Sequence, residues 1–346
     1  MKTQAAVLVE TGRPLELGEL DVPALKPGQV LVKIAVSGVC HTQILECRGY
    51  RGKDNFLPHC LGHEGSGTVH DIGPGVLKVK VGDRVSLSWI KGSGADVSGS
   101  VYQWGQRRVN AGAITTFSHY SVISENRLTV VPESISMLDG AMIGCAVATG
   151  VGAVFNTAQP RPGQSLVVFG AGGVGLCAIA GAAIAGCMPI IAVDINPQKL
   201  GLAKAMGATH GLDAGAPDCL DEINRLCPGG ADFAIESSGR PEVMVNALLS
   251  VRNQGGVAVI IGNARYGEHL QIDPRQLNLG KRLLGTWGGD NWPDRDFPRY
   301  LKLLSSGRLS LSPLLSKTYR LDQINHALED LESGRVARPL IDMAMA

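Results

Sequence analysis

Residues 165–194 read SLVVFGAGGVGLCAIAGAAIAGCMPIIAVD, and this stretch decides the fold of the middle of the chain. The apolar, β-branched run at 165–169 has the length and composition of a buried strand. Gly170, Gly172 and Gly175 follow at once in the spacing G-x-G-x-x-G, and an apolar stretch of helical length, residues 174–186, comes next. A second apolar run at 189–193 ends at Asp194. The order strand, glycine turn, helix, strand and acid predicts a Rossmann unit, part of a doubly wound parallel α/β sheet.

Each part of this stretch suits a bound dinucleotide. The first glycine permits a tight turn, the second leaves room for a pyrophosphate, and the third lets the helix pack close to the strand. The start of the helix, at Gly173 and Val174, presents free N–H groups and a positive dipole to the phosphates. Asp194, 19 residues beyond Gly175, can accept hydrogen bonds from a ribose diol and would repel a 2′-phosphate. The stretch therefore predicts an NAD site in preference to an NADP site.

Composition places the chain among ordinary globular enzymes. Its 346 residues suggest two domains, and 45% apolar content is enough for sizeable cores. A net charge of +1 without long runs of like charge predicts no nucleic-acid partner and no membrane surface. The N-terminus carries no long apolar segment of a signal peptide, and eight cysteines in such a chain favour thiols or metal ligands over disulfides. A cytoplasmic enzyme is therefore expected.

The pattern of elements changes near Gly144. Before it, short strands alternate with glycine turns, for example at 30–36 and 120–124, which predicts a barrel-like or folded sheet. Residues 90–112 read as irregular and polar, with no cysteine. After it, predicted strands at 166–169, 190–193, 233–236 and 257–261 alternate with helices, which indicates a parallel sheet. Helical patterns at 296–306 and 322–333 and a short strand at 339–343 end the chain.

Three short clusters contain residue types that bind zinc. Cys40, His63 and Cys145 together make a Cys₂His set, and a catalytic zinc takes three protein ligands and keeps one position open. No local C-x₂-C spacing joins them, and a buried cysteine is usually a small core residue. On spacing alone His59, Cys47 and Cys60 are rival ligands. The residues by themselves support a metal site and leave its members open.

Taken in order, the motifs resemble those of the zinc-dependent medium-chain alcohol dehydrogenases, nearly from end to end. The resemblance rests on GVCHT at 38–42, GHEGSGTV at 62–69, VGDRV at 81–85, GCAVATG at 144–150, FGAGGVG at 169–175, VDINPQKL at 193–200 and LDQINHALEDLESGRVARPL at 321–340. It implies a β-rich, GroES-like catalytic domain from residues 1–147 and 288–346. A Rossmann domain at 148–287 would lie between them in sequence, with zinc and substrate in the cleft between the domains.

The resemblance also implies roles for single residues. Cys40, His63 and Cys145 match the ligands of one catalytic zinc, and Glu64 matches an occasional ligand or a neighbour of the metal. Thr42 matches the residue that takes the proton of the alcohol. His41 and Arg338 match residues near the cofactor phosphates, and Lys199 matches a lysine near the adenosine ribose. The implied reaction is hydride transfer between NAD(H) and an alcohol/aldehyde or alcohol/ketone pair.

The chain also departs from the family pattern. The cysteine-free segment after Trp89 predicts that the structural zinc of many members is missing, so one zinc per chain is expected. Gln43 replaces the usual acid, and Leu45 stands where some members end a proton relay in histidine. Trp89 falls at a position that lines the substrate pocket in the family and would narrow it.

Several alternatives stay open on the sequence alone. A polyol or cyclitol dehydrogenase of the same superfamily would share these motifs, because loss of the structural zinc also occurs there. A zinc-free quinone or alkene reductase, or a cofactor-binding protein without activity, is a more distant alternative. The family resemblance further implies a homodimer or homotetramer, and a small-molecule substrate that the sequence does not identify.

Overall fold

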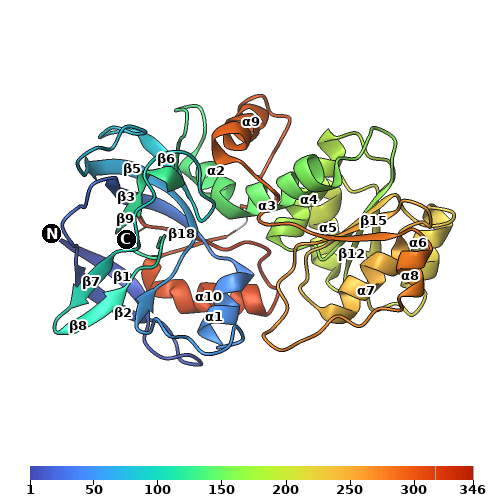
Figure 1. Cartoon of the computed structure of the whole chain (residues 1–346), viewed down its shortest axis with the longest axis horizontal. Coiled ribbons are helices and arrows are strands. Elements are labelled where there is room, and N and C mark those ends of the chain that lie inside the picture. The colour runs from blue at the N-terminus through green and yellow to red at the C-terminus, as the bar shows by residue number, and fades with distance from the viewer. Residues whose placement is uncertain (316, 346) are drawn as a thin grey trace. The chain divides into compact units, whose positions relative to one another are not determined.

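The computed structural model describes residues 1–315 and 317–345. The chain forms two compact units (Figure 1). Unit 1 comprises Met1–Cys145, Trp292–Gly307 and Leu315–Ala346, and unit 2 comprises Ala146–Asn291 and Arg308–Leu314. The chain thus leaves unit 1 after Cys145 and returns to it at Trp292.

Unit 1 contains a small closed barrel. Its strands follow the order β1, β2, β7, β8 and β4, where β1 is Lys2–Leu8, β2 Glu16–Asp21, β7 Val101–Trp104, β8 Arg107–Asn110 and β4 His59–Cys60. Strands β7 and β8 form an antiparallel hairpin, and Gln103 of β7 pairs with Asp21 of β2. The prediction that 90–112 is irregular was therefore wrong for this part. Strands β7 and β8 have four residues each, too few for an alternation of inward and outward side chains to be recognised in the sequence. Their backbone groups pair with β2 and β4, and this pairing makes them strands.

A second sheet of unit 1 positions two of the candidate metal ligands, Cys40 shortly after β3 and His63 directly before β5. Its path runs β10, β6, β5, β3, β18 and β17, with β9 also paired to β3. The bounds are β10 Leu128–Val130, β6 Arg84–Ser88, β5 Glu64–Ile72, β3 Gln29–Gly38, β18 Leu340–Asp342, β17 Thr318–Tyr319 and β9 Tyr120–Ser124. Strand β18 brings the C-terminal part of the chain beside β3, with Ile341 opposite Ser37. This pairing places residues near 338 next to those near 40.

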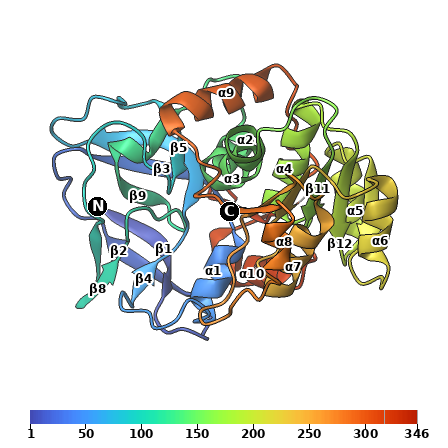
Figure 2. The same ribbon diagram turned by 45° about the vertical axis from the view of Figure 1, so that its right-hand side comes forward.

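Helix α1 (His41–Cys47) is held in unit 1 by packing against α10 (Ile324–Glu332), as both views show (Figures 1 and 2). Ile44 and Cys47 of α1 belong to one buried cluster with Ile324 and Leu328 of α10. The other helices of unit 1 are α2 (Met137–Met142), α9 (Pro293–Ser305) and the 3₁₀ turns Glu125–Arg127 and Leu321–Gln323. Burial of this apolar face fixes α1, and with it the residue before it, Cys40.

Unit 2 is a parallel sheet covered by helices, which confirms the predicted doubly wound fold. The strand order is β13, β12, β11, β14, β15 and β16, and every pair is parallel. The strands are β11 Leu166–Phe169, β12 Ile190–Asp194, β13 His210–Asp213, β14 Phe233–Glu236, β15 Val257–Ile260 and β16 Arg282–Gly285. The helices are α3 Ala148–Gly152, α4 Gly173–Ile184, α5 Pro197–Ala205, α6 Cys219–Leu226, α7 Pro241–Ser250 and α8 Arg275–Asn278. Figure 2 shows β11 and β12 side by side with α4 and α5.

One helical run, Met137–Ala158, was not expected from the sequence. It joins α2 and α3 through π-helical turns at Ile143–Val147 and Ala153–Ala158. It is long and apolar enough to cross a membrane, with a mean hydropathy of 1.6. However, 83% of its most apolar window is buried inside the protein, so length and composition are weak evidence for a span.

Candidate active site

Three of the predicted ligands meet in unit 1. The ligand atoms of Cys40, His63 and Cys145 lie within 4.8 Å of one another. Both cysteines are buried, and Nε2 of His63 is a buried nitrogen without a hydrogen-bond partner among the described residues. Two sulfurs and one imidazole nitrogen at this spacing form a donor set that zinc accepts, so the residues present fit the metal.

Glycines directly before two of the ligands allow the chain to approach so closely. Gly62 has φ +103°, and a Cβ there would lie 2.2 Å from Oγ1 of Thr116. A Cβ at Gly144 would lie 2.0 Å from the carbonyl oxygen of Leu87. The hydroxyl of Ser88 also donates to the Gly144 carbonyl at 2.7 Å, and Cys145 follows within a π-helical turn. These contacts explain physically why glycine precedes both His63 and Cys145.

The thiols of Cys40 and Cys145 differ in pKa. A hydrogen bond from Cys145, together with Arg338 and His63, holds the pKa of Cys40 well below its usual range despite burial. The same hydrogen bond and burial hold the pKa of Cys145 well above its usual range. Burial alone would lower the pKa of His63, but the Cys40 thiolate outweighs it and raises that pKa. The site therefore already stabilises a thiolate, which is the form of cysteine that binds metals.

Glu64 lies beside the ligand set but is engaged elsewhere. Its Oε1 pairs with Nη2 of Arg338, and both side chains are buried, with exposures of 0% for Glu64 and 3% for Arg338. The Glu64 carboxylate, the Cys40 thiolate and Cys145 together hold the pKa of Arg338 above its usual range, against the effect of burial. Direct ligation by Glu64 and contact of Arg338 with a pyrophosphate remain predictions.

The rival ligands lie outside the group. Burial raises the pKa of both Cys47 and Cys60 to about 12, so neither thiol is activated. Cys47 belongs to the apolar cluster of α1 and α10, and Cys60 packs inside the barrel. His59 uses Nε2 to bond Asp54 at 2.9 Å and Nδ1 to bond the Cys60 carbonyl at 3.0 Å. Tertiary structure thus selects among the cysteines and histidines where spacing could not.

The other predicted residues of unit 1 lie near these ligands to different degrees. Oγ1 of Thr42 is 3.8 Å from Sγ of Cys40, so its hydroxyl lies beside the ligand set. His41, the first residue of α1, is exposed. Trp89 follows β6, is half-buried, and accepts a hydrogen bond from Arg127 through its carbonyl oxygen.

A pocket of about 710 Å³ in unit 1 reaches the ligand set. His63 and Gln43 both line it. Its wall combines apolar and charged side chains with the chain after the β7–β8 hairpin: Glu46, Arg51, Lys53, Asp54, Phe56, His59 and residues 110–114. Trp89 is not among the described residues that line this pocket. The sequence did not reveal the pocket because most of its wall comes from loops that carry no motif.

The glycine turn of unit 2 has the geometry that the sequence predicts. Gly170 has φ +92°, and a Cβ at Gly175 would lie 1.9 Å from the Gly170 carbonyl oxygen, so helix and turn pack in direct contact. A Cβ at Gly172 would meet nothing within 4 Å, which leaves its surroundings open. The hydroxyl of Ser237 donates to the Gly170 carbonyl at 2.9 Å and ties the turn to the end of β14. Helix α4 then begins at Gly173 and includes Val174.

Asp194 ends β12 at the same edge of the sheet. Its carboxylate accepts hydrogen bonds from the backbone N–H of Ala171 at 2.7 Å and of Asn196 at 2.9 Å. The first bond orients the acid toward the glycine turn. Lys199 lies half-buried in the first turn of α5. The roles of Asp194 and Lys199 toward a cofactor remain predictions.

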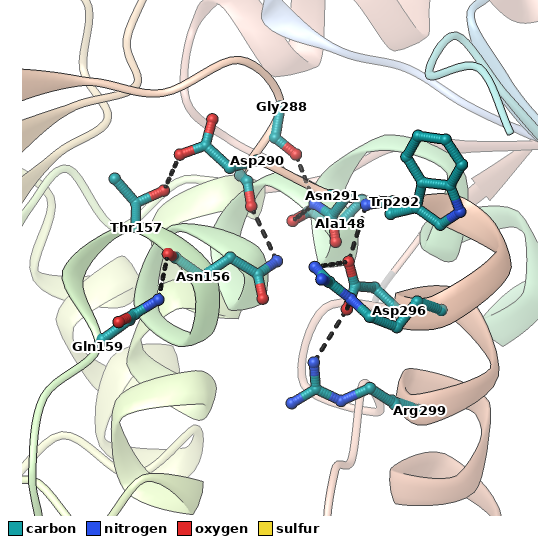
Figure 3. Close-up of polar contacts among 12 residues, drawn as sticks. Ala148, Asn156, Thr157, Gln159, Gly288, Asp290, Asn291, Trp292, Asp296 and Arg299 are labelled. Carbon is teal, nitrogen blue, oxygen red and sulfur yellow. Dashed lines mark hydrogen bonds and ion pairs between the residues drawn. The ribbon is translucent and has the colours of Figure 1, made fainter.

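A strap, residues 288–291, follows β16 in unit 2 and was not expected from the sequence. Gly288, Gly289 and Asp290 have φ values of +60°, +78° and +49°. Side chains from the helical run hold these residues: Asn156 donates to the Gly289 carbonyl at 3.0 Å and Thr157 to Asp290 at 2.6 Å (Figure 3). The Gly-Gly-Asp-Asn run at 288–291 is the signal that could have revealed it.

The tryptophans on either side of the strap are both exposed, Trp287 by 76% and Trp292 by 57%. In unit 1, the backbone N–H of Trp292 donates to the carboxylate of Asp296, which also pairs with Arg299 (Figure 3). Neither tryptophan is among the described residues that line the pocket at His63.

Comparison with known proteins agrees with this geometry. The family model described as an alcohol dehydrogenase GroES-like domain matches residues 26–133, and that of a zinc-binding dehydrogenase matches residues 173–306. An S-(hydroxymethyl)glutathione dehydrogenase of Synechocystis sp. is 34% identical, over 99% of this chain and 100% of that protein. The chain belongs to the zinc-dependent medium-chain alcohol dehydrogenases.

Solved structures are similar along the whole chain. An alcohol dehydrogenase zinc-binding domain protein from Burkholderia ambifaria has a TM-score of 0.91 and 30% identity, with full coverage of both chains. The benzyl alcohol dehydrogenase of Acinetobacter calcoaceticus has a TM-score of 0.90 and 32% identity, over 99% of this chain and 100% of that one. The protein is therefore an oxidoreductase of the zinc-dependent alcohol dehydrogenase type. Zinc held by Cys40, His63 and Cys145 would act as a Lewis acid on the oxygen of an alcohol or carbonyl.

Proposed function

We propose that this protein interconverts an alcohol and its aldehyde or ketone with NAD(H), at one zinc site per chain. The observation that carries the proposal is the convergence of Cys40, His63 and Cys145 within 4.8 Å, next to a pocket lined by His63. The hydroxyl of Thr42, beside Cys40, accepts a hydrogen bond from the alcohol and relays its proton toward solvent, releasing its own proton as it takes the new one. The NAD-binding part is the segment 148–287, which contains the glycine turn.

The preference for NAD over NADP is supported by Asp194. Its carboxylate is buried at the end of β12 and bonded to the N–H of Ala171, beside the glycine turn. A negative charge in this position repels the 2′-phosphate of NADP and accepts hydrogen bonds from the ribose diol of NAD.

The absence of a structural zinc is supported by how the segment after Trp89 is held. Glu125 accepts backbone N–H bonds from Leu77, Lys78 and Ala95. The chain then continues into the β7–β8 hairpin, which completes the barrel. The backbone of this segment is thus held at Ala95 by a carboxylate, in a stretch that contains no cysteine.

The substrate is a small molecule, and the pocket narrows its class. A volume of about 710 Å³ is within the usual range for drug-sized ligands. Phe56 and Ile114 offer apolar surface for an aromatic or aliphatic alcohol. Lys53 is a basic residue of the same wall, beside Arg51, which pairs with Glu46 at 3.0 Å, and it favours a second candidate, the carboxylate-bearing adduct S-(hydroxymethyl)glutathione. Polyols are the third class to be tested.

We also propose a homodimer or homotetramer in the cytoplasm. Strand β16 is an edge strand of its sheet, and most of its residues are exposed, including Leu284 at 38%. The unpaired backbone N–H and C=O groups of such an edge strand can pair with those of a second copy of the chain. The cysteines are all free thiols, which suits a reducing compartment.

One experiment tests the function. The purified protein is analysed for zinc and assayed with NAD and NADP on benzyl alcohol, a short aliphatic alcohol, sorbitol, and formaldehyde with glutathione. We expect one zinc per chain and NAD-dependent turnover of at least one alcohol, with loss of both in Cys145→Ala. Two zincs per chain would contradict the single-site proposal, and turnover unaffected by Cys145→Ala would contradict the site itself.

A further inference from the structure

Gln43 connects the helix start to the candidate ligand His63. It is the third residue of α1 and is fully buried. The backbone N–H of Cys40 donates to Oε1 of Gln43 at 2.6 Å. A glutamine three residues into a helix often caps the residue before the helix in this way. Because this bond takes the oxygen, the amide nitrogen of Gln43 lies on the other side, 2.7 Å from Nδ1 of His63.

This arrangement decides which nitrogen of His63 carries the hydrogen. An amide NH₂ group can only donate, so Nδ1 must accept. A neutral imidazole that accepts at Nδ1 carries its hydrogen at Nε2. That nitrogen belongs to the group with the sulfurs of Cys40 and Cys145. A metal ligand needs the opposite form, with a lone pair at Nε2 and the hydrogen at Nδ1.

We propose that Gln43 is a positioning residue that weakens the hold of this site on zinc. To bind zinc through Nε2, His63 must donate from Nδ1, and the carboxamide must turn over to present its oxygen. The NH₂ group then faces the N–H of Cys40, so one buried donor loses its partner. A carboxylate would accept from Cys40 and from His63 at the same time. This inference rests on the zinc site proposed above.

The test compares Gln43→Glu with the wild type in zinc affinity, measured by competition with a chromogenic chelator at one fixed pH. Groups that orient a metal-bound histidine change affinity by about 10- to 100-fold. We expect Gln43→Glu to bind zinc tighter by a factor in this range. Gln29→Glu is the matched control, because Gln29 is a buried carboxamide that accepts from the Lys26 N–H and donates to Ser100. Its zinc affinity should stay within about twofold of the wild type.

A second measurement separates the hydrogen bond from the added charge. NMR of ring-labelled histidine, assigned with a His63→Gln variant, reports the tautomer in zinc-depleted protein. We expect hydrogen at Nε2 of His63 in the wild type and at Nδ1 in Gln43→Glu. Hydrogen at Nδ1 in the wild type would overturn the proposal even if Gln43→Glu binds tighter, because charge alone would then explain the gain.

The outcomes also distinguish this inference from the proposed function. If the wild type binds one zinc per chain and Gln43→Glu binds it no tighter, the role of Gln43 is refuted and the zinc site stands. If neither protein binds zinc, the zinc site is refuted, and the role of Gln43 falls with it. The tautomer measurement on the wild type needs no variant at position 43, so a misfolded Gln43→Glu would still leave the proposal open to refutation.

Discussion

Replacing Glu125 by glutamine should loosen the segment that follows Trp89. Glu125 is buried, with 3% of its surface exposed. Its Oε2 accepts from Leu77 and Lys78 at 2.8 and 2.9 Å, and its Oε1 accepts from Ala95 at 2.9 Å. A glutamine keeps an oxygen on one side only, so an NH₂ group must face at least one backbone N–H.

The magnitude follows from these contacts. Loss of one hydrogen bond to a charged group costs about 1.5–3 kcal/mol, and the donor left unpaired adds to it. We therefore expect Glu125→Gln to lower the free energy of unfolding by about 2–4 kcal/mol, which is roughly 4–16 °C in Tm for a domain of this size. Thermal and urea unfolding measure the effect, and limited proteolysis should show faster cleavage within residues 89–100. Glu133→Gln, at an exposed position, is the control and should change stability by less than about 0.5 kcal/mol.

The same substitution has a pH signature. Burial works to raise the pKa of Glu125, but the hydrogen bonds from Ala95, Lys78 and Leu77 outweigh it, so the pKa lies below its ordinary value of 4.5. A carboxyl whose pKa is lowered by folding stabilises the protein above its ordinary pKa. That stabilisation is lost as the pH falls through the lower, folded value. The difference between wild type and Glu125→Gln should therefore shrink in acid. An equal difference at all pH values, or none at neutral pH, would refute the reasoning.

Three further predictions concern the reaction. Asp194→Ser should raise the ratio of NADP- to NAD-dependent kcat/KM by about tenfold or more, because it removes the charge that repels a 2′-phosphate; an unchanged ratio would contradict this role. Gly175→Ala should abolish NADH binding in fluorescence titrations, since its Cβ would lie 1.9 Å from the Gly170 carbonyl oxygen, and full binding would contradict the packing. Thr42→Ala should lower kcat by about 10²-fold or more. The control Leu45→Ala, at a buried apolar position, should lower Tm and leave kcat nearly unchanged. Equal kcat in both variants would reject a proton-transfer role for Thr42.

Local sequence patterns were sufficient for the Rossmann unit. Strands β11 and β14 lie at the predicted residues, and the helix after the glycine turn, α4, begins within one residue of its predicted start at Val174. Such signals are strong because strand, turn and helix follow one another along the chain, and each has its own periodicity. The cysteine-free segment is the opposite case. Its hairpin β7–β8 exists through pairing with β2 and β4, which are far away in sequence.

What the sequence determined by itself was the chemistry available: a turn shaped for a dinucleotide, an acid placed after it, and cysteines and histidines that could bind zinc. Tertiary structure decided which of these act together. Packing of α1 on α10 and the approach of Gly144 to β6 bring Cys40 and Cys145 to His63, while Cys47 and Cys60 remain in apolar cores. The hydrogen bond between Gln43 and His63 was also decided by the tertiary structure. It joins residues 20 positions apart in the chain, and their spacing in the sequence does not show that they lie within hydrogen-bonding distance in the folded protein.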